Sequence, residues 1–285
     1  MTLSAFVLIL TAAFIHASWN LLAKRAGGGA PFVWAAAVAG TLLFLPISIA
    51  LGTFQQVNWN GQTVVFLAGS GLLQTLYFIT LQRGYKVGDL SLVYPVARGT
   101  GPLLATLGAI ILLGERPAPL GVVGAGLVVA GVFAISATAP RTNASRQSAI
   151  LYGLLTGMFI ASYTLWDKVA VSALLLPPVL YDTISVAVRA SLLTPIGVRH
   201  WPEVRTLWRD HKWEIVGVGC LSEFGYILVL TALKTTPVIY VAPMREISIL
   251  IGTVMGARLL AEGHLRQRLI AASAILLGVV AIAFS

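Results

Sequence analysis

Ten long apolar segments constrain this sequence more than any other feature. Each is about 20 residues long, which is the length of helix that crosses the hydrocarbon core of a bilayer. Because unpaired backbone groups are too costly in lipid, each segment is expected to be a helix. The sequence therefore predicts an all-α membrane protein with ten transmembrane helices. We place them at residues 3–23, 31–51, 62–82, 90–113, 118–138, 149–171, 177–198, 215–233, 237–260 and 267–284.

Composition excludes several other classes of protein. Charged residues are 10% of the 285 residues and hydrophobic residues are 58%, whereas soluble proteins carry about 25% charged residues. A net charge of +9 would suggest a nucleic acid partner for a soluble domain. Here the positions of the basic residues explain it instead, so no nucleic acid partner is expected. One cysteine, Cys220, and one histidine within an apolar stretch, His16, are too few for a metal centre, and no cofactor is predicted.

Lysine and arginine are concentrated on one side of the predicted topology. The odd-numbered connections hold twelve of them, whereas the even-numbered connections and both termini hold only Arg116 and Lys234. Since loops rich in these residues stay in the cytoplasm, both termini are expected on the periplasmic or extracellular side of the inner (plasma) membrane. Lys24 and Arg25 follow the first apolar segment, which predicts an uncleaved span. The longest connection, 199–214, carries three tryptophans and is expected to lie at the membrane interface.

The sequence also contains an internal repeat. An offset of 147 residues superposes Trp19-Asn20 on Trp166-Asp167 and Arg98 on Arg245. Each half holds five spans, an odd number, so the second half must enter the membrane upside down. We therefore predict two five-helix repeats at residues 1–140 and 148–285, the second inverted. Secondary transporters use such repeats around a substrate site near the midplane, although a duplication can also simply build a larger bundle.

Three stretches resemble a known family. HASWNLLAK (His16 to Lys24), the segment from Leu90 to Pro117 and its echo from Val238 to Gly263 resemble the EamA domains of the drug/metabolite transporter (DMT) superfamily. The resemblance covers essentially the whole chain as two EamA units, although the second lacks the proline that follows Glu115-Arg116 in the first. It implies export of small metabolites, commonly amino acids. The ten-helix form is similar to the YddG-type aromatic amino acid exporters.

Ionisable residues inside the spans are the first candidates for function, because they are costly at membrane depth. Arg98 and Arg245 could hold a substrate carboxylate as bidentate forks. Alternatively, they pair with Glu246, Asp167 or Glu223 as locks between the halves. The same three acids, Asp167, Glu223 and Glu246, are candidates for proton coupling.

Aromatic and amide side chains at similar depth complete the predicted site, since pockets for amphipathic solutes are mainly apolar with a few polar groups. Substrate binding is thus expected among Trp19, Asn20, Gln74, Tyr77, Tyr94, Arg98, Tyr163, Trp166, Tyr226 and Arg245.

Other polar positions lead to structural predictions. Asp182 lies near the outer end of its span and is expected to be solvated, whereas Arg189 lies deeper and needs an acidic partner or a water-filled cavity. Glu115 lies at a span end, where capping is the simpler explanation. Prolines and glycines at 94–102 and 243–246 predict broken helices at matching places in the two halves.

These observations favour a secondary transporter that exports small amphipathic metabolites by alternating access, most simply amino acids and among them aromatic ones. Other exported classes, such as nucleobases, nucleosides or drugs, stay open, as do proton-coupled and facilitative mechanisms. An intramembrane enzyme using Ser70 and His16 is a remote alternative, because no supporting motif accompanies them. The expected partners are a small-molecule substrate and membrane lipid, and a monomer is compatible with this prediction.

Overall fold

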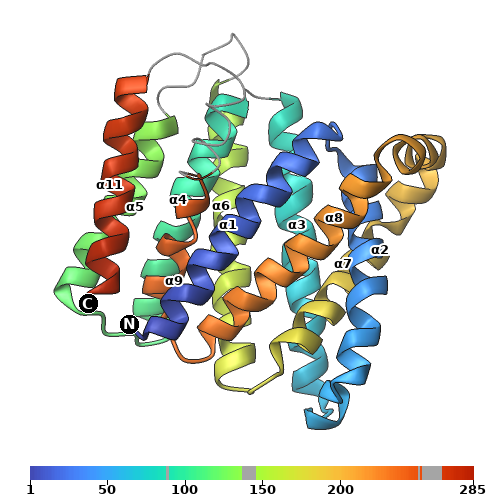
Figure 1. Cartoon of the computed structure of the whole chain (residues 1–285), viewed down its shortest axis with the longest axis horizontal. Helices are drawn as coiled ribbons and strands as arrows, with labels where there is room; N and C mark the ends of the chain where they lie inside the picture. Colours follow the sequence, from blue (N-terminus) through green and yellow to red (C-terminus); the bar gives the residue numbers. More distant parts are fainter. Residues whose placement is uncertain (88–89, 137–145, 250, 252–264) are drawn as a thin grey trace.

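The computed structural model is a bundle of helices that run between two ends, with both termini at the same end (Figure 1). It describes residues 1–87, 90–136, 146–249, 251 and 265–285. The elements in this part of the chain are α1 (Leu3–Arg25), α2 (Ala30–Ala50), η1 (Thr53–Gln56), α3 (Gly61–Val87), α4 (Leu90–Leu112), α5 (Pro119–Ser136), α6 (Arg146–Ser172), α7 (Pro178–Arg199), α8 (Trp201–Leu233), α9 (Val238–Met244) and α11 (Leu265–Ala283).

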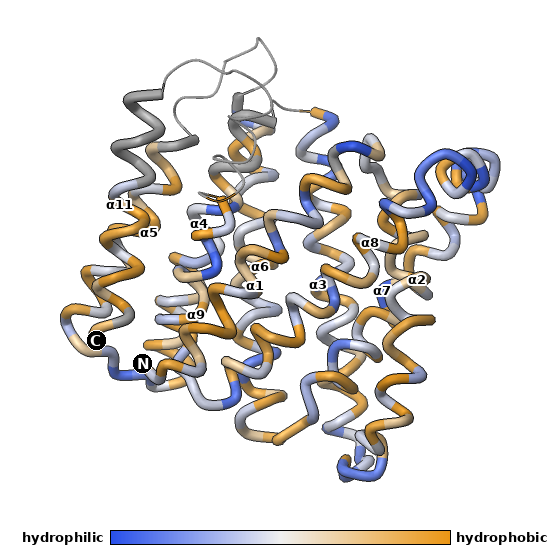
Figure 2. The backbone as a smooth tube through the Cα atoms, viewed as in Figure 1, coloured by the Kyte–Doolittle hydropathy of each residue, from blue (hydrophilic) through white to orange (hydrophobic). Residues whose placement is uncertain are grey.

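The prediction of an all-α membrane protein is confirmed. Helices α1, α2, α3, α6, α7 and α8 are each long and apolar enough to cross a membrane, and α4, α5 and α11 contain shorter apolar stretches. Apolar residues line the outside of the bundle, as Figure 2 shows along α2 and α11. On this outer surface, Leu42 of α2 is 68% exposed and Ile111 of α4 is 75% exposed. Such an exterior suits lipid and would not suit water.

The connection expected at 199–214 is instead the first part of α8, which begins at Trp201 and bends at His211. Pro202 stands in its first turn, where proline lacks no hydrogen bond that the helix needs. The tryptophans Trp201, Trp208 and Trp213 are all more than half exposed. The segment is therefore an amphipathic helix at the end of the bundle, and its interfacial role stays a prediction.

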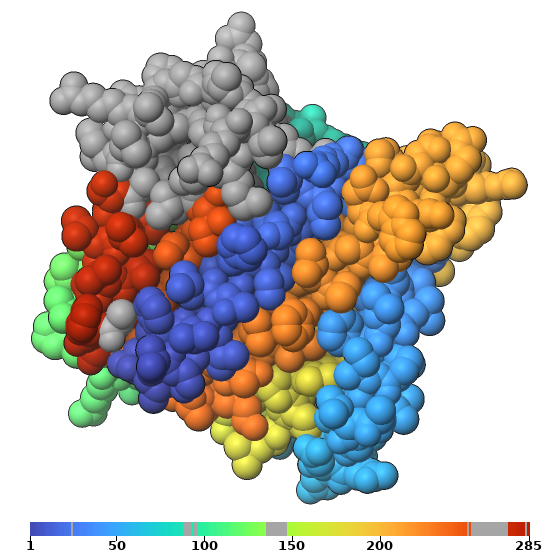
Figure 3. Space-filling model, in the orientation of Figure 1, coloured from blue at the N-terminus to red at the C-terminus, as the bar shows by residue number. Residues whose placement is uncertain are grey.

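Helix packing follows the 147-residue offset, which equates α1 with α6 and α3 with α8. Helix α1 packs along α8, and α6 packs along α3. Figure 3 shows α1 and α8 side by side across one face of the molecule. Helices α2 and α7 also pack together, as do α5 and α11. The first helix of each predicted repeat thus packs on the third helix of the other, while the division into two inverted repeats stays a prediction.

Glycines allow these helices to approach closely. A Cβ on Gly219 of α8 would lie 2.6 Å from the Ala36 carbonyl oxygen and 2.8 Å from the Gly40 nitrogen of α2. A Cβ on Gly124 of α5 would likewise lie 2.7 Å from the Gly278 carbonyl oxygen of α11, and a Cβ on Gly278 would lie 2.6 Å from the Gly124 carbonyl oxygen. Small residues at such crossings are typical of membrane helices, where backbone contact replaces the hydrophobic effect as the source of stability.

Candidate functional site

A buried aspartate lies where four helices meet. Asp167 of α6 is fully buried. Its Oδ2 accepts a hydrogen bond of 2.5 Å from the Tyr226 hydroxyl of α8, and its Oδ1 accepts one of 2.7 Å from the Tyr181 hydroxyl of α7. The Ser70 hydroxyl of α3 also lies beside this carboxyl. Three hydroxyl groups therefore replace the water that a buried carboxyl group has lost.

A second polar network extends from Ser70 towards α7 and α8. Gln74 Nε2 donates to Ser70 Oγ at 3.1 Å, and Gln74 Oε1 accepts from an Arg189 NH group at 3.0 Å. The other terminal nitrogen of Arg189 pairs with Glu223 Oε1 at 3.0 Å, and Ser222 donates to the same oxygen. The acidic partner that Arg189 was expected to need is thus Glu223.

The prediction that Asp182 is solvated is wrong. Asp182 is only 1% exposed, and its neighbours Leu180, Tyr181 and Thr183 are equally buried. Helix α7 begins at Pro178, so Asp182 already lies in its second turn. At this point α7 is covered by α2, α3 and α8.

A third polar group joins the two halves of the sequence. Arg98 Nε of α4 lies 3.1 Å from Glu246 Oε2, and Arg98 also donates to Ser248 Oγ at 3.4 Å. Both side chains of the ion pair are at least nine-tenths buried. Of the two interpretations of Arg98, this geometry is that of a lock between the halves. Its contact with a substrate carboxylate stays a prediction.

The predicted break in the ninth span is present. Helix α9 ends at Met244, and Arg245 and Glu246 form a turn before the chain resumes helical geometry. Glu246 N bonds to the Pro243 carbonyl at 3.0 Å, which is a bond over three residues instead of four.

The matching break in the fourth span is absent, because α4 is continuous over Leu90–Leu112. Its glycines serve close packing instead, since a Cβ on Gly101 would lie 2.8 Å from Ile160 of α6. The packing of α6 against α4 therefore holds the helix straight despite its prolines.

Arg245, at the break, points into a group of tyrosines. Its guanidinium carbon lies 5.4 Å from the Tyr226 ring centroid. Tyr226 contacts Tyr163 edge-on at 6.1 Å, and Tyr163 contacts Tyr77 at 5.8 Å. Within the part of the chain that the structure describes, no hydrogen bond or ion pair reaches the Arg245 guanidinium. Three predicted tyrosines therefore lie in contact with one another beside a fourth predicted residue, Arg245, whose donors are unused among the described residues.

Other predicted residues lie elsewhere. Trp166 stacks on Phe66 at 4.4 Å and donates to the Phe66 carbonyl at 2.9 Å. Its recorded partners are thus on α3 and do not include Tyr77, Tyr163 or Tyr226. Trp19 contacts the His16 ring at 4.7 Å, and the exposed Asn20 donates to the His16 carbonyl. The Tyr94 side chain lies outside the described residues. Substrate binding by these four residues stays a prediction.

Sequence reasoning missed Tyr181 and gave Ser70 another role. Nothing in an apolar run beginning Leu180-Tyr181 distinguishes a ligand of Asp167 from ordinary packing. Ser70 was considered as a nucleophile, but its hydroxyl is engaged by Gln74 and Asp167. His16 contacts Trp19, and among the described residues no hydrogen bond joins it to Ser70.

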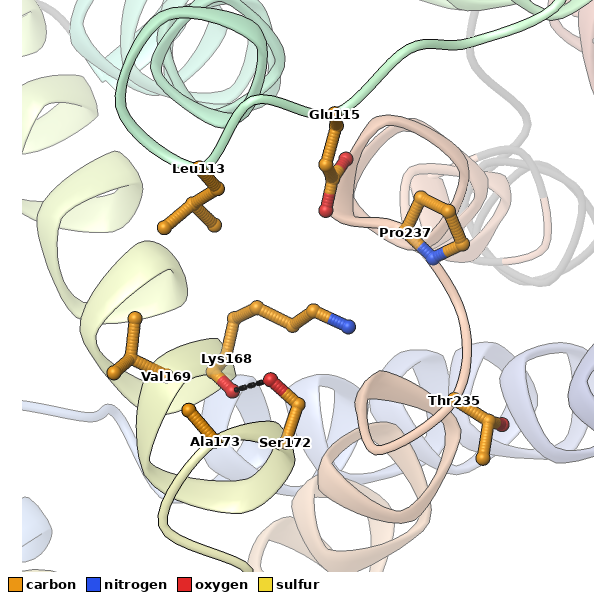
Figure 4. Close-up of a pocket in the computed structure, with 8 residues that line it drawn as sticks. All are labelled: Leu113, Glu115, Lys168, Val169, Ser172, Ala173, Thr235 and Pro237. Atoms are coloured by element: carbon orange, nitrogen blue, oxygen red, sulfur yellow. Dashed lines mark hydrogen bonds between the residues drawn. The ribbon is translucent and has the colours of Figure 1, made fainter.

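A pocket of 340 Å³ lies at the end of the bundle that holds the termini (Figure 4). Lys168 Nζ donates to the carbonyls of Leu233 and Thr236 at 2.7 Å and 3.1 Å. Glu115 accepts from the backbone N–H groups of Val238 and Ile239 at 2.8 Å and 3.2 Å. The two charges thus complement the end of α8 and the start of α9, and the capping prediction for Glu115 is confirmed.

Comparison with known proteins agrees with this architecture. Residues 3–137 match the sequence profile of the EamA-like transporter family. The first half of the chain therefore resembles this family, and the match supports membership of the DMT superfamily. Family members are transporters rather than enzymes, so this EamA protein is a multi-pass membrane transporter of small solutes.

Solved structures support the fold of this EamA transporter. A protein of known crystal structure superposes with a TM-score of 0.80 at 17% identity, over 100% of this chain and 98% of that chain. At this identity the likeness concerns the fold alone. A search of curated proteins finds no significant match.

The Arg98–Glu246 pair gives a prediction that distinguishes two roles of Glu246, a structural ion pair between the halves and a residue that carries a coupled proton. Glu246→Gln removes the charge that balances a buried guanidinium, so this variant should lose about 3 kcal/mol of stability. Its unfolding temperature in detergent, read by tryptophan fluorescence, measures the loss.

Asp210→Asn is the matched control, because Asp210 forms an exposed ion pair with Arg209 and its removal should leave stability unchanged. A Glu246→Gln variant as stable as the wild type would contradict the lock and leave Glu246 as a candidate for coupling alone.

Proposed function

We propose that this EamA transporter exports amino acids, aromatic ones among them, from a site centred on Arg245. The observation that carries the proposal is the guanidinium without an ion-pair or hydrogen-bond partner in the described part of the chain. A guanidinium in the membrane interior is costly unless an anion faces it. A substrate carboxylate would supply that anion in bidentate geometry.

The surroundings of Arg245 suit the rest of an amino acid. Tyr77, Tyr163 and Tyr226 provide aromatic surface for a ring or an apolar side chain. Tyr226 also donates to Asp167, whose carboxylate would attract a substrate ammonium group. A neutral nucleobase would supply no anion to Arg245, so the geometry favours a substrate with a carboxylate over that alternative class.

Alternating access by two inverted repeats would expose this site to each side in turn. Support comes from the packing, in which α1 on α8 corresponds to α6 on α3 under the 147-residue offset. The Arg98–Glu246 pair and the contacts of Glu115 and Lys168 join segments from the two halves. Substrate-driven rocking would have to rearrange such contacts.

The site gives a prediction for Arg245. Arg245→Gln should lower kcat/KM for an aromatic amino acid at least about 30-fold, because removing one member of a buried charge pair costs about 2–5 kcal/mol. Arg245→Lys keeps the charge without the fork and should lie between Gln and wild type. Flux into proteoliposomes measures the rates.

Arg209→Gln changes an exposed arginine and should leave flux unchanged. In wild-type protein, phenylalanine should compete for transport, whereas phenethylamine, which lacks the carboxylate, should not. Wild-type flux in Arg245→Gln, or equal competition by phenylalanine and phenethylamine, would contradict the proposed site.

We further propose that the protein lies in the inner membrane with both termini outside the cytoplasm. In Figure 1 the termini share one end with the connections α4–α5, α6–α7 and α8–α9. These connections carry only Arg116 and Lys234 as basic residues. Basic residues are thus scarce at this end, as expected of a non-cytoplasmic face.

Cysteine labelling tests the orientation. In a Cys220→Ser background, a cysteine introduced at Ser285 should react with a membrane-impermeant maleimide in intact spheroplasts. A cysteine at the exposed Lys86, at the other end of the bundle, should react only after permeabilisation. The reverse pattern would place the termini in the cytoplasm.

A further inference from the structure

Two buried carboxyl groups share one guanidinium between α7 and α8. Asp182 is 1% exposed and Glu223 is 3% exposed. Arg189 is bonded to Glu223 and to Gln74. Both carboxyl oxygens of Asp182 are buried and, among the described residues, receive no hydrogen bond from an ordinary donor. The Glu223 carboxyl is within hydrogen-bonding reach of Asp182, but two ionised carboxylates cannot bond to each other.

Among the described residues, Arg189 is the positive charge recorded beside this pair. Helix α2 packs on both α7 and α8 and has no titratable residue. It closes one side, since a Cβ on Gly40 would lie 2.9 Å from Glu223 Cγ. Helix α3 contributes the neutral Gln74 and Ser70. Helix α6 contributes Asp167, whose negative charge also acts on Asp182. At least two acidic side chains and one basic side chain therefore meet at this place in the bundle.

One proton resolves this imbalance. If one carboxyl group is protonated, its O–H can donate to the other carboxyl, and Arg189 neutralises the remaining negative charge. Two carboxyl groups that share a site hold a proton in this way because both cannot easily ionise together. No water or external ion is needed to satisfy Asp182.

We propose that Asp182 and Glu223 form a proton-binding site that shares one proton in the described conformation, and that exchange of this proton is coupled to transport. Loss of the proton would leave one uncompensated negative charge in the closed bundle, which favours an arrangement that admits water or a cation. The coupling part rests on the proposed function. The proton site itself does not.

A series of adjacent polar side chains connects the two sites. Hydrogen bonds lead from Glu223 to Arg189, Gln74 and Ser70, and Ser70 lies beside Asp167. Asp167 then accepts from Tyr226, whose ring lies against Arg245. A change of partner at Arg189 can therefore reach the tyrosines of the substrate site through side chains already in contact.

Infrared spectroscopy of the purified, substrate-free protein tests the proton site directly. At neutral pH the wild type should show the C=O stretch of a protonated carboxylic acid, shifted in D₂O. Asp182→Asn, which keeps the size of the side chain, should remove one such group, and so should Glu223→Gln. Asp210→Asn, at an exposed carboxylate, is the control and should not change the band.

The wild-type spectrum is decisive even if a variant fails to fold, because the absence of any acid band would overturn the proposal. An acid band that survives unchanged in folded Asp182→Asn would also overturn it.

Transport across a pH gradient tests the coupling. Proteoliposomes with Asp182→Asn should retain exchange of labelled phenylalanine for unlabelled phenylalanine but lose accumulation driven by the gradient. Wild-type accumulation that ignores the gradient, or gradient-driven accumulation that persists in the variant, would overturn the coupling. Absence of all phenylalanine flux in the wild type would overturn the proposed function and the coupling to it, while the infrared result would still decide the proton site.

Discussion

Charged side chains that enter the interior of this bundle must find partners on other helices, because lipid surrounds the bundle and offers none. Arg98 pairs with Glu246 across the two halves, and Arg189 pairs with Glu223 across α7 and α8. Asp167 collects hydroxyl groups from α7 and α8. These contacts fix which helix faces meet inside. The glycine crossings, such as Gly219 on α2, then bring the backbones close enough for the contacts to form.

The same requirement distinguishes structural from functional charges. Arg98, Arg189 and Lys168 all have partners within the protein, whereas the Arg245 guanidinium has neither an ion pair nor a hydrogen bond in the described part of the chain. It lies at the break after α9, where the chain leaves regular helical geometry inside the bundle. Such interruptions are where transporters commonly bind solutes. The proposed carboxylate site thus coincides with the one of these four basic residues whose charge has no partner in the described part of the chain.

The sequence predicted much of the fold because its dominant signal is physical. Apolar length specifies membrane helices, so the described helices match the predicted spans within a few residues, except that α8 begins at Trp201. The end of the ninth predicted span, residues 252–260, lies outside the described residues. Helix continuity was harder to predict. Pro243 precedes a break whereas Pro102 does not, and the difference depends on the packing of α6 against α4, which local sequence does not encode.

The site was predictable in part. Arg245, Tyr226, Tyr163 and Tyr77 were chosen for residue type and depth, and the structure gathers them. The choice of partners was not predictable, because Arg98 had several acids within plausible reach. The burial of Asp182 depends on which face of α7 meets α2 and α8, and Tyr181 gave no sign of its bond to Asp167.

Distances between spin labels test the central claim most directly. In a Cys220→Ser background, one label pair at the exposed Arg116 and Lys234 reports on the end with the termini, and a second at Lys86 and His200 reports on the other end. The account predicts that saturating phenylalanine shifts the two distance distributions in opposite senses, one end widening as the other narrows. Distributions that do not respond, or that widen together, would contradict alternating access around the Arg245 site.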